Sequence, residues 1–70
     1  MFILVNLMNG NLFSYDEIDT AKAEAIKMNL ASSDHPAFEL WEIDPNSICI
    51  YHSRLYRNFG SSVMYWKKET

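Results

Sequence analysis

Only one cysteine, Cys49, is present among 70 residues, so the fold cannot contain an internal disulfide. Chains of about 70 residues usually need a disulfide, a metal or an oligomer interface to supplement one small core. We therefore expect a single domain over residues 1–70 and consider a homodimer as one way of completing its core. An unpaired cysteine is also typical of a reducing compartment, so we expect a cytoplasmic protein.

Charge is divided unevenly along the chain. Residues 1–44 carry eight acidic and two basic side chains, whereas residues 45–70 carry four basic side chains and one acidic side chain. The net charge of −3 and the apolar content of 49% are ordinary for a globular domain and unlike a disordered tail. The two parts of the chain therefore offer different surfaces to a partner.

The N-terminal segment 2–8 favours a β-strand. It is rich in strand-forming residues, and it is too short for a membrane span and lacks the basic residues of a signal peptide. Apolar residues occupy both of its faces, which predicts a central strand or a strand that is covered on two sides. The dipeptide Asn9-Gly10 predicts a type I′ turn that leads into a second strand at residues 11–13.

The next segment predicts a helix from about Tyr15 to Leu30. Ser14 and Glu17 have the spacing of a capping box, in which each side chain bonds to the other residue's backbone N–H. Spacing alone leaves open which of two apolar strips faces the core. The strips are Ile18, Ala21, Ala25 and Met28 on one side, and Ala23, Ile26 and Leu30 on the other.

Extended structure follows Pro36, which ends the helix. Residues 37–43 and 47–53 form a predicted hairpin around Asp44-Pro45-Asn46, with Asp44 placed to accept hydrogen bonds from the turn. Residues 62–67 predict a last strand after a turn at 58–61, and 55–57 are a candidate for an additional one. The order β-(β)-α-β-β-(β)-β predicts an α+β fold, in which about four antiparallel strands carry one helix on one face.

Catalytic chemistry is not indicated. Cys49 and His52 resemble a thiol and its base, but residues three apart on a strand point to opposite faces unless a bulge intervenes. We expect Cys49 to be a small buried apolar residue. His35 and His52 have no third ligand at a metal-binding spacing, and Gly10 and Gly60 both lie at turns, so no phosphate-binding loop is present. We expect no enzymatic activity, no metal and no cofactor.

Aromatic and basic residues are interleaved in the C-terminal third. Such mixtures stack single-stranded nucleic acid on sheets, and they also dominate the hot spots of protein interfaces. The negative net charge and the lack of an RRM motif favour a protein partner and leave single-stranded nucleic acid as the alternative. The aromatic residues are Tyr51, Tyr56, Phe59, Tyr65 and Trp66, and the basic ones are Arg54, Arg57, Lys67 and Lys68.

The segment FSYDEIDTAKAEAIKMNLASSDHPAFELWEI resembles the small accessory proteins that bacteriophages encode, with a strand, an alanine-rich helix and an aromatic-bearing hairpin. Some of these proteins inhibit host defence, among them anti-CRISPR proteins. The resemblance covers about the first two-thirds of the chain. It implies a stoichiometric inhibitor that works in the cytoplasm of the host cell, and it assigns no role to a numbered residue.

Together these observations predict a non-enzymatic protein-binding module that does not use a membrane. A host complex that binds nucleic acid is one expected partner, because acidic residues can occupy its phosphate sites. The alternative reading, single-stranded nucleic acid, predicts binding that depends on Arg54 and Arg57. The expected contact residues are Trp41, Arg54, Tyr56, Arg57, Tyr65 and Trp66, with Asp16, Glu17, Asp19 and Glu24 as an acidic contact.

Overall fold

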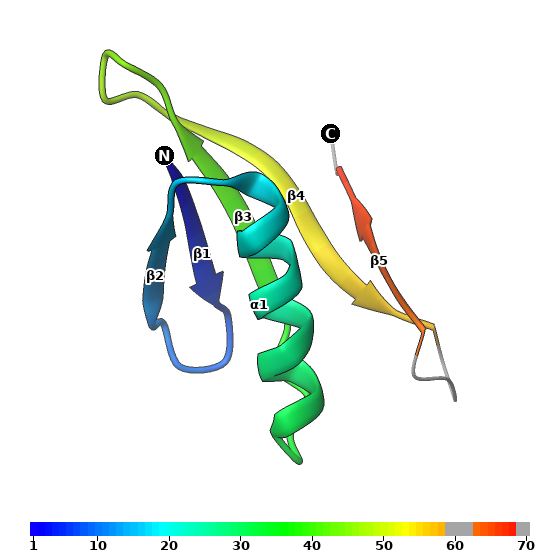
Figure 1. Cartoon of the computed structure of the whole chain (residues 1–70). Coiled ribbons are helices and arrows are strands. Elements are labelled where there is room, and N and C mark those ends of the chain that lie inside the picture. The colour runs from blue at the N-terminus through cyan, green and yellow to red at the C-terminus, as the bar shows by residue number, and fades with distance from the viewer. Residues whose placement is uncertain (59–62, 69–70) are drawn as a thin grey trace.

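The structure, a computed structural model, describes residues 1–58 and 63–68. Within them, five antiparallel strands form one sheet in the order β2-β1-β3-β4-β5, and one helix lies across one of its faces (Figure 1). The predicted α+β fold is confirmed, with five strands where about four were expected. The elements are β1 (Phe2–Asn6), β2 (Leu12–Tyr15), α1 (Ile18–Ala31), β3 (Phe38–Ile43), β4 (Cys49–Arg57) and β5 (Met64–Lys67).

Strand β1 is central, as its two apolar faces predicted. It pairs with β2 on one side and with β3 on the other. The prediction of a type I′ turn at Asn9-Gly10 is wrong. Such a turn requires a positive φ at both central residues, and of the two only Gly10 has one, of 78°. Residues 7–11 instead form a longer loop, closed by hydrogen bonds from Gly10 N to Asn6 O (2.8 Å) and from Asn6 N to Asn11 O (2.9 Å). Glycine takes the left-handed conformation without steric cost.

The prediction of a capping box at Ser14 and Glu17 is also wrong. Ser14 lies in β2 opposite Ile3, and α1 begins three residues later than expected, with Glu17 at its N-cap and no side-chain capping hydrogen bond. The reason is that strand pairing and helix capping require different backbone conformations at Ser14. Strand β2 continues through Tyr15, where it pairs with Phe2, so Ser14 cannot adopt the geometry of a helix cap.

One strip of α1 faces the sheet. Ala21, Ala25 and Asn29 are buried, whereas Ala23 and Leu30 are exposed. The two alanines have no side chain beyond Cβ, so the helix backbone approaches the sheet closely. The helix packs mainly on β1, β2 and β3. Strands β4 and β5 therefore receive less cover from α1 than the rest of the sheet.

The hairpin between β3 and β4 turns as predicted. Asp44 Oδ1 accepts hydrogen bonds from Asn46 N and Ile48 N, both at 2.9 Å. Strand β4 is longer than expected, because the segments predicted as 47–53 and 55–57 form one continuous strand. Strand β5 starts at Met64. Residues 59–61 of the predicted turn, and residue 62, where the last strand was predicted to start, lie outside the described part of the chain.

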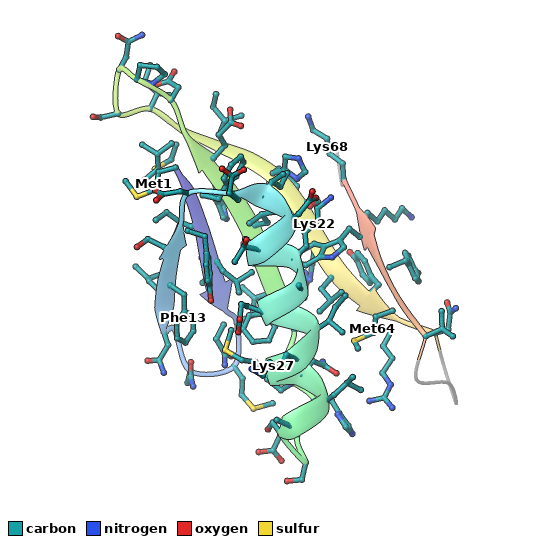
Figure 2. The ribbon with its side chains drawn as sticks, in the orientation of Figure 1. Met1, Phe13, Lys22, Lys27, Met64 and Lys68 are labelled. Atoms are coloured by element: carbon teal, nitrogen blue, oxygen red, sulfur yellow. The ribbon has the colours of Figure 1, made fainter. Side chains whose placement is uncertain are left out.

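The core lies between α1 and the sheet. Phe13 on β2 and Met64 on β5 flank the helix on opposite sides (Figure 2). Aromatic residues from both halves of the chain contribute to this layer. The fully buried apolar residues are Leu4, Ala21, Ala25, Phe38, Leu40 and Leu55, and the half-buried ones around them are Phe2, Phe13, Tyr15, Ile18, Ile26, Met28, Met64 and Trp66.

Candidate functional site

The candidate site is the face of the sheet opposite α1, which we call the open face. Side chains alternate along a strand, so the neighbours of the core residues Leu4, Leu40 and Leu55 point to this side. Among the described residues, the helix lies on the other face and no second sheet is present. The open face comprises Ile3, Val5, Leu12, Ser14, Glu39, Trp41, Ile43, Cys49, Tyr51, Arg54, Tyr56, Tyr65 and Lys67.

A β-bulge in β4 assembles the aromatic part of this face. Trp41 is opposite Tyr51 and Leu40 is opposite Ser53, so His52 is an extra residue in the ladder. The bulge reverses the alternation within β4. Tyr51 before it and Arg54 after it consequently share the open face, although residues three apart on a regular strand point to opposite sides.

Two aromatic pairs result from this arrangement. The Trp41 and Tyr51 rings meet edge to face, with centroids 5.4 Å apart and planes at 73°. The Tyr56 and Tyr65 rings stack across β4 and β5, with centroids 5.7 Å apart and planes at 20°. Tyr65 keeps 44% of its surface exposed, so the second pair is open to a partner.

Charged groups lie between these rings. One row across the sheet places Leu12, Val5, Glu39, Arg54 and Lys67 opposite one another on successive strands. The Arg54 guanidinium lies over the Tyr56 ring, 5.8 Å from its centroid. The Trp41 Nε1–H donates to Glu39 Oε1 at 3.2 Å, which holds the indole plane in place.

The structure thus brings together four of the predicted contact residues, Trp41, Arg54, Tyr56 and Tyr65. The sequence prediction did not include Glu39, Tyr51 and Lys67 as contact residues, although they belong to the same face. Strict alternation places Tyr51 on the side opposite Tyr56, and no residue type at the bulge signals otherwise. The pairing of Lys67 with Arg54 could have been predicted by placing β5 next to β4.

Trp66 and Arg57 lie on the α1 side of the sheet, away from this group. Trp66 is opposite Leu55, and its ring packs against the core with Lys22 Nζ 5.9 Å from the centroid. Its Nε1–H is buried and has no hydrogen-bond partner among the described residues. Arg57 is opposite Met64. Neither residue can join Tyr65 in one flat contact.

The predicted acidic contact also lies on the α1 side. Asp16 and Glu17 precede α1 and Asp19 lies in its first turn, and all three are exposed. Glu24 is half-buried near Tyr15, where burial and the Glu24 charge together raise the pKa of the Tyr15 phenol. The acidic group and the open face are therefore separate surfaces.

Cys49 is exposed, so the expectation that it is buried is wrong. It begins β4 opposite Ile43, near the tip of the β3–β4 hairpin, which projects past α1 (Figure 1). Ile48 and Ile50 beside it are also exposed, because no other described part of the chain covers the hairpin tip.

His52 lies on the α1 side of the sheet and its Nδ1 is 2.8 Å from Ser53 Oγ. Burial lowers the pKa of the imidazole, and Lys22 and Lys68 lower it further, while Glu42 raises it. Cys49 is on the other face, so the two residues do not form a nucleophile and base. Across the described residues, no group of three or more histidine, cysteine, aspartate or glutamate side chains gathers that could hold a metal ion.

Within residues 1–58 and 63–68, no helix combines the length and the apolar character that crossing a membrane requires. No protein-family model, no curated protein and no solved structure matches the chain.

Proposed function

We propose that this protein is a non-enzymatic binding module whose open face docks onto another protein. We further propose that it acts as a stoichiometric inhibitor, blocking a host protein by covering part of its surface. One observation carries the first proposal. A whole face of the sheet, with four aromatic rings and Arg54, has no second layer over it among the described residues.

The residue types on this face favour a protein partner. Tryptophan, tyrosine and arginine contribute most to protein interfaces, because their large side chains bury much area for few rotatable bonds. Ring contacts and the Trp41–Glu39 hydrogen bond already hold these side chains, which lowers the entropy lost on binding. Aliphatic residues continue the surface over β1 and β2, including Leu12 with 66% exposure. An aliphatic extension suits a protein surface better than it suits nucleic acid.

The inhibitory role rests on the resemblance to phage accessory proteins. It fits a small chain with an uncovered sheet face, in whose described residues no group that could hold a metal ion gathers. A protein that blocks by occupancy needs only affinity and one rigid surface.

Capture of partners with matched variants tests the proposal. Tagged wild-type protein and a Tyr56→Ser/Tyr65→Ser variant are incubated with nuclease-treated bacterial lysate, and the bound proteins are identified by mass spectrometry. Leu30→Ser is the control, because Leu30 is 51% exposed on the helix side. We expect a protein that the wild type and the control retain at defined stoichiometry and that the double variant loses by tenfold or more, as loss of about 1.4 kcal/mol or more predicts.

Calorimetry with the purified partner then confirms the stoichiometry, and an activity assay of that partner tests inhibition. The proposal fails if the double variant retains every protein that the wild type retains. Sedimentation of the free protein identifies one special case. If the wild type is a dimer and the double variant is a monomer, the partner is a second copy of this chain.

Single-stranded nucleic acid is the second candidate, favoured by the presence of Arg54 and Lys67 beside the stacked rings of Tyr56 and Tyr65 on one sheet face. Fluorescence anisotropy with a labelled oligothymidine tests it. This candidate requires binding that falls steeply as salt rises and that Arg54→Gln and Lys67→Gln abolish, because Arg57 lies on the other face of the sheet. Salt-independent binding, or none, removes it.

A further inference from the structure

Strands β3 and β4 share three rows of residues on the open face. Each row joins two side chains of matching chemistry: an acid and a base, two aromatic rings, and two apolar groups. Pairing between the two strands ends at the row of the acid and the base. The rows are Glu39 with Arg54, Trp41 with Tyr51, and Ile43 with Cys49.

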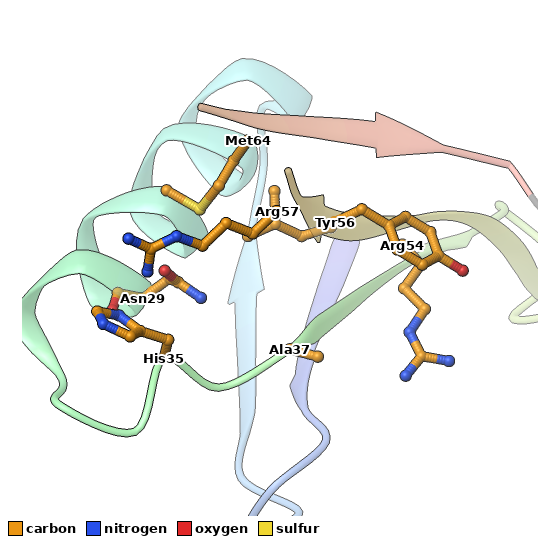
Figure 3. A pocket seen from close by; sticks show the side chains of 8 residues that line it. Asn29, His35, Ala37, Arg54, Tyr56, Arg57 and Met64 are labelled. Atoms are coloured by element: carbon orange, nitrogen blue, oxygen red, sulfur yellow. The ribbon is translucent and has the colours of Figure 1, made fainter. Parts of the chain in front are cut away.

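The charged row presents both of its charges on the open face. Glu39 Oε1 accepts from the Trp41 Nε1–H at 3.2 Å, and the Arg54 guanidinium lies 5.8 Å from the Tyr56 ring centroid. Neither contact is with a group of opposite charge. Figure 3, which looks into a pocket of about 180 Å³ beneath the last turns of α1, shows the Arg54 side chain directed away from the helix, whereas Met64 lies on the helix side. A molecule that covers the open face therefore meets one acid and one base side by side.

The three rows make this face complementary to itself. A two-fold axis that runs between β3 and β4, parallel to the strands, places β3 of one copy over β4 of another and keeps every residue in its own row. Glu39 of each copy then faces Arg54 of the other. The aromatic row meets an aromatic row, and the apolar row meets an apolar row. Packed sheets lie about 10 Å apart, a distance that a glutamate and an arginine side chain span together.

The open face is also large enough for a stable dimer. A standard interface covers about 800 Å² of each partner, which is about a sixth of the 4696 Å² that this protein exposes. A second copy would supply the second layer that the sheet lacks. Chains of about 70 residues usually need such a supplement, and among the described residues only six apolar side chains are buried in the core.

We propose that two copies of this chain cover each other's open faces around this axis, so that the protein without its target is a homodimer. The inference rests on the proposed function, because it uses the open face as a binding surface and names a second copy as a partner of that surface. A host protein that docks there displaces the second copy, and its apparent affinity falls with the fraction of protein that is monomeric. Self-association keeps the aromatic face out of water until the target is met.

Charge reversal in two separate variants tests the axis. Glu39→Arg puts two bases in the charged row and Arg54→Glu puts two acids there, so two copies of either variant repel each other. We expect sedimentation equilibrium at about 100 μM to find a dimer for the wild type and a monomer for each variant, because interfaces of standard size have affinities of micromolar or better. An equimolar mixture of the two variants should be dimeric again, since every base then faces an acid of the other copy. Repulsion within each chain remains in the mixture, so only contacts between copies can restore the dimer.

Lys27→Glu is the control, because it reverses a charge on an exposed residue of α1 and should leave the dimer intact. Equal dissociation by Lys27→Glu would mean that net charge controls association, and it would overturn the inference. Urea unfolding of each variant checks that it is folded. If a reversal prevents folding, Glu39→Gln and Arg54→Gln take its place, and each should weaken self-association about tenfold or more by removing the attraction without adding repulsion.

Three further results overturn the inference. These are a wild type that is monomeric at about 100 μM, a mixture of the two reversal variants that stays monomeric, and a dimer that survives in both reversal variants. A monomeric wild type would leave the open face to a host protein, so the capture experiment could still succeed. A dimer that re-forms on mixing, with no host protein captured, would uphold this inference while the proposed inhibition fails.

Discussion

Tyr56 and Tyr65 stack across the β4–β5 pair with their ring planes 20° apart, on the face of the sheet that α1 does not cover. Arg54 lies over the same Tyr56 ring from the neighbouring position on that face. The edge of the sheet away from the helix is therefore held in part by cross-strand side-chain contacts. These contacts also present the aromatic surface to a partner.

Replacing either tyrosine tests this stacking. Tyr56→Ala and Tyr65→Ala should each lower the free energy of unfolding, and the double variant should lose less than their sum. We expect a coupling of about 0.5–1 kcal/mol, the usual size for a cross-strand aromatic pair. Urea unfolding of the four proteins measures it. Strict additivity would mean that the rings do not stabilise each other in solution.

Helix packing gives a second prediction. Ala25 is fully buried against the sheet, and Ala23, two residues earlier, is exposed. Ala25→Leu should destabilise the protein by about 1–3 kcal/mol, because the added methyl groups force the helix off the sheet. Ala23→Leu adds the same groups where there is room and should change stability by less than about 0.5 kcal/mol. The difference in urea midpoint between the two variants checks the orientation of α1, and similar midpoints would contradict it.

The β3–β4 turn gives a third prediction. Asp44 Oδ1 accepts two backbone hydrogen bonds within the turn. Asp44→Ala should cost about 1–2 kcal/mol, because two N–H groups lose their acceptor. Asp44→Asn retains a side-chain oxygen at the same place and should recover most of that loss. Equal destabilisation in the two variants would show that the charge of Asp44, and not its hydrogen bonds, supports the turn.

Local chemistry predicted much of the fold. The two apolar faces of segment 2–8 indicated a central strand, and Asp44-Pro45-Asn46 indicated the hairpin that follows. The alanine spacing predicted the helix, and the structure resolves the choice between its strips, because Ala21 and Ala25 are buried while Ala23 is exposed. These features depend on residues close together in the chain, so the sequence reveals them directly.

The open face depends on contacts that local patterns do not encode. The bulge at His52 changes which residues share a face, and it follows from the register between β3 and β4. The failed capping box has a similar cause, since β1 recruits Ser14 and Tyr15 into β2 before the helix can begin. Cys49 looked buried between two isoleucines, but whether a hairpin tip is covered depends on how far the helix extends.

The last prediction concerns pH and the same bulge residue. Burial, together with the Lys22 and Lys68 charges, holds the pKa of His52 below its ordinary value of 6.5. In the unfolded chain this imidazole takes up its proton near that value, whereas the folded protein takes it up only at lower pH. The unfolded state thus binds more protons as pH falls from about 7, so the free energy of unfolding should decrease from there until pH passes below the folded-state pKa.

His52→Gln removes the titrating group and should flatten this part of the profile. The measurement is the urea midpoint of both proteins between about pH 7.5 and about pH 5.5, a range above most carboxylate pKa values. Their difference isolates the contribution of His52. Identical slopes in the two proteins would mean that the imidazole has the same proton affinity in the folded and unfolded states. That result would contradict the lowered pKa that burial and the Lys22 and Lys68 charges give to His52.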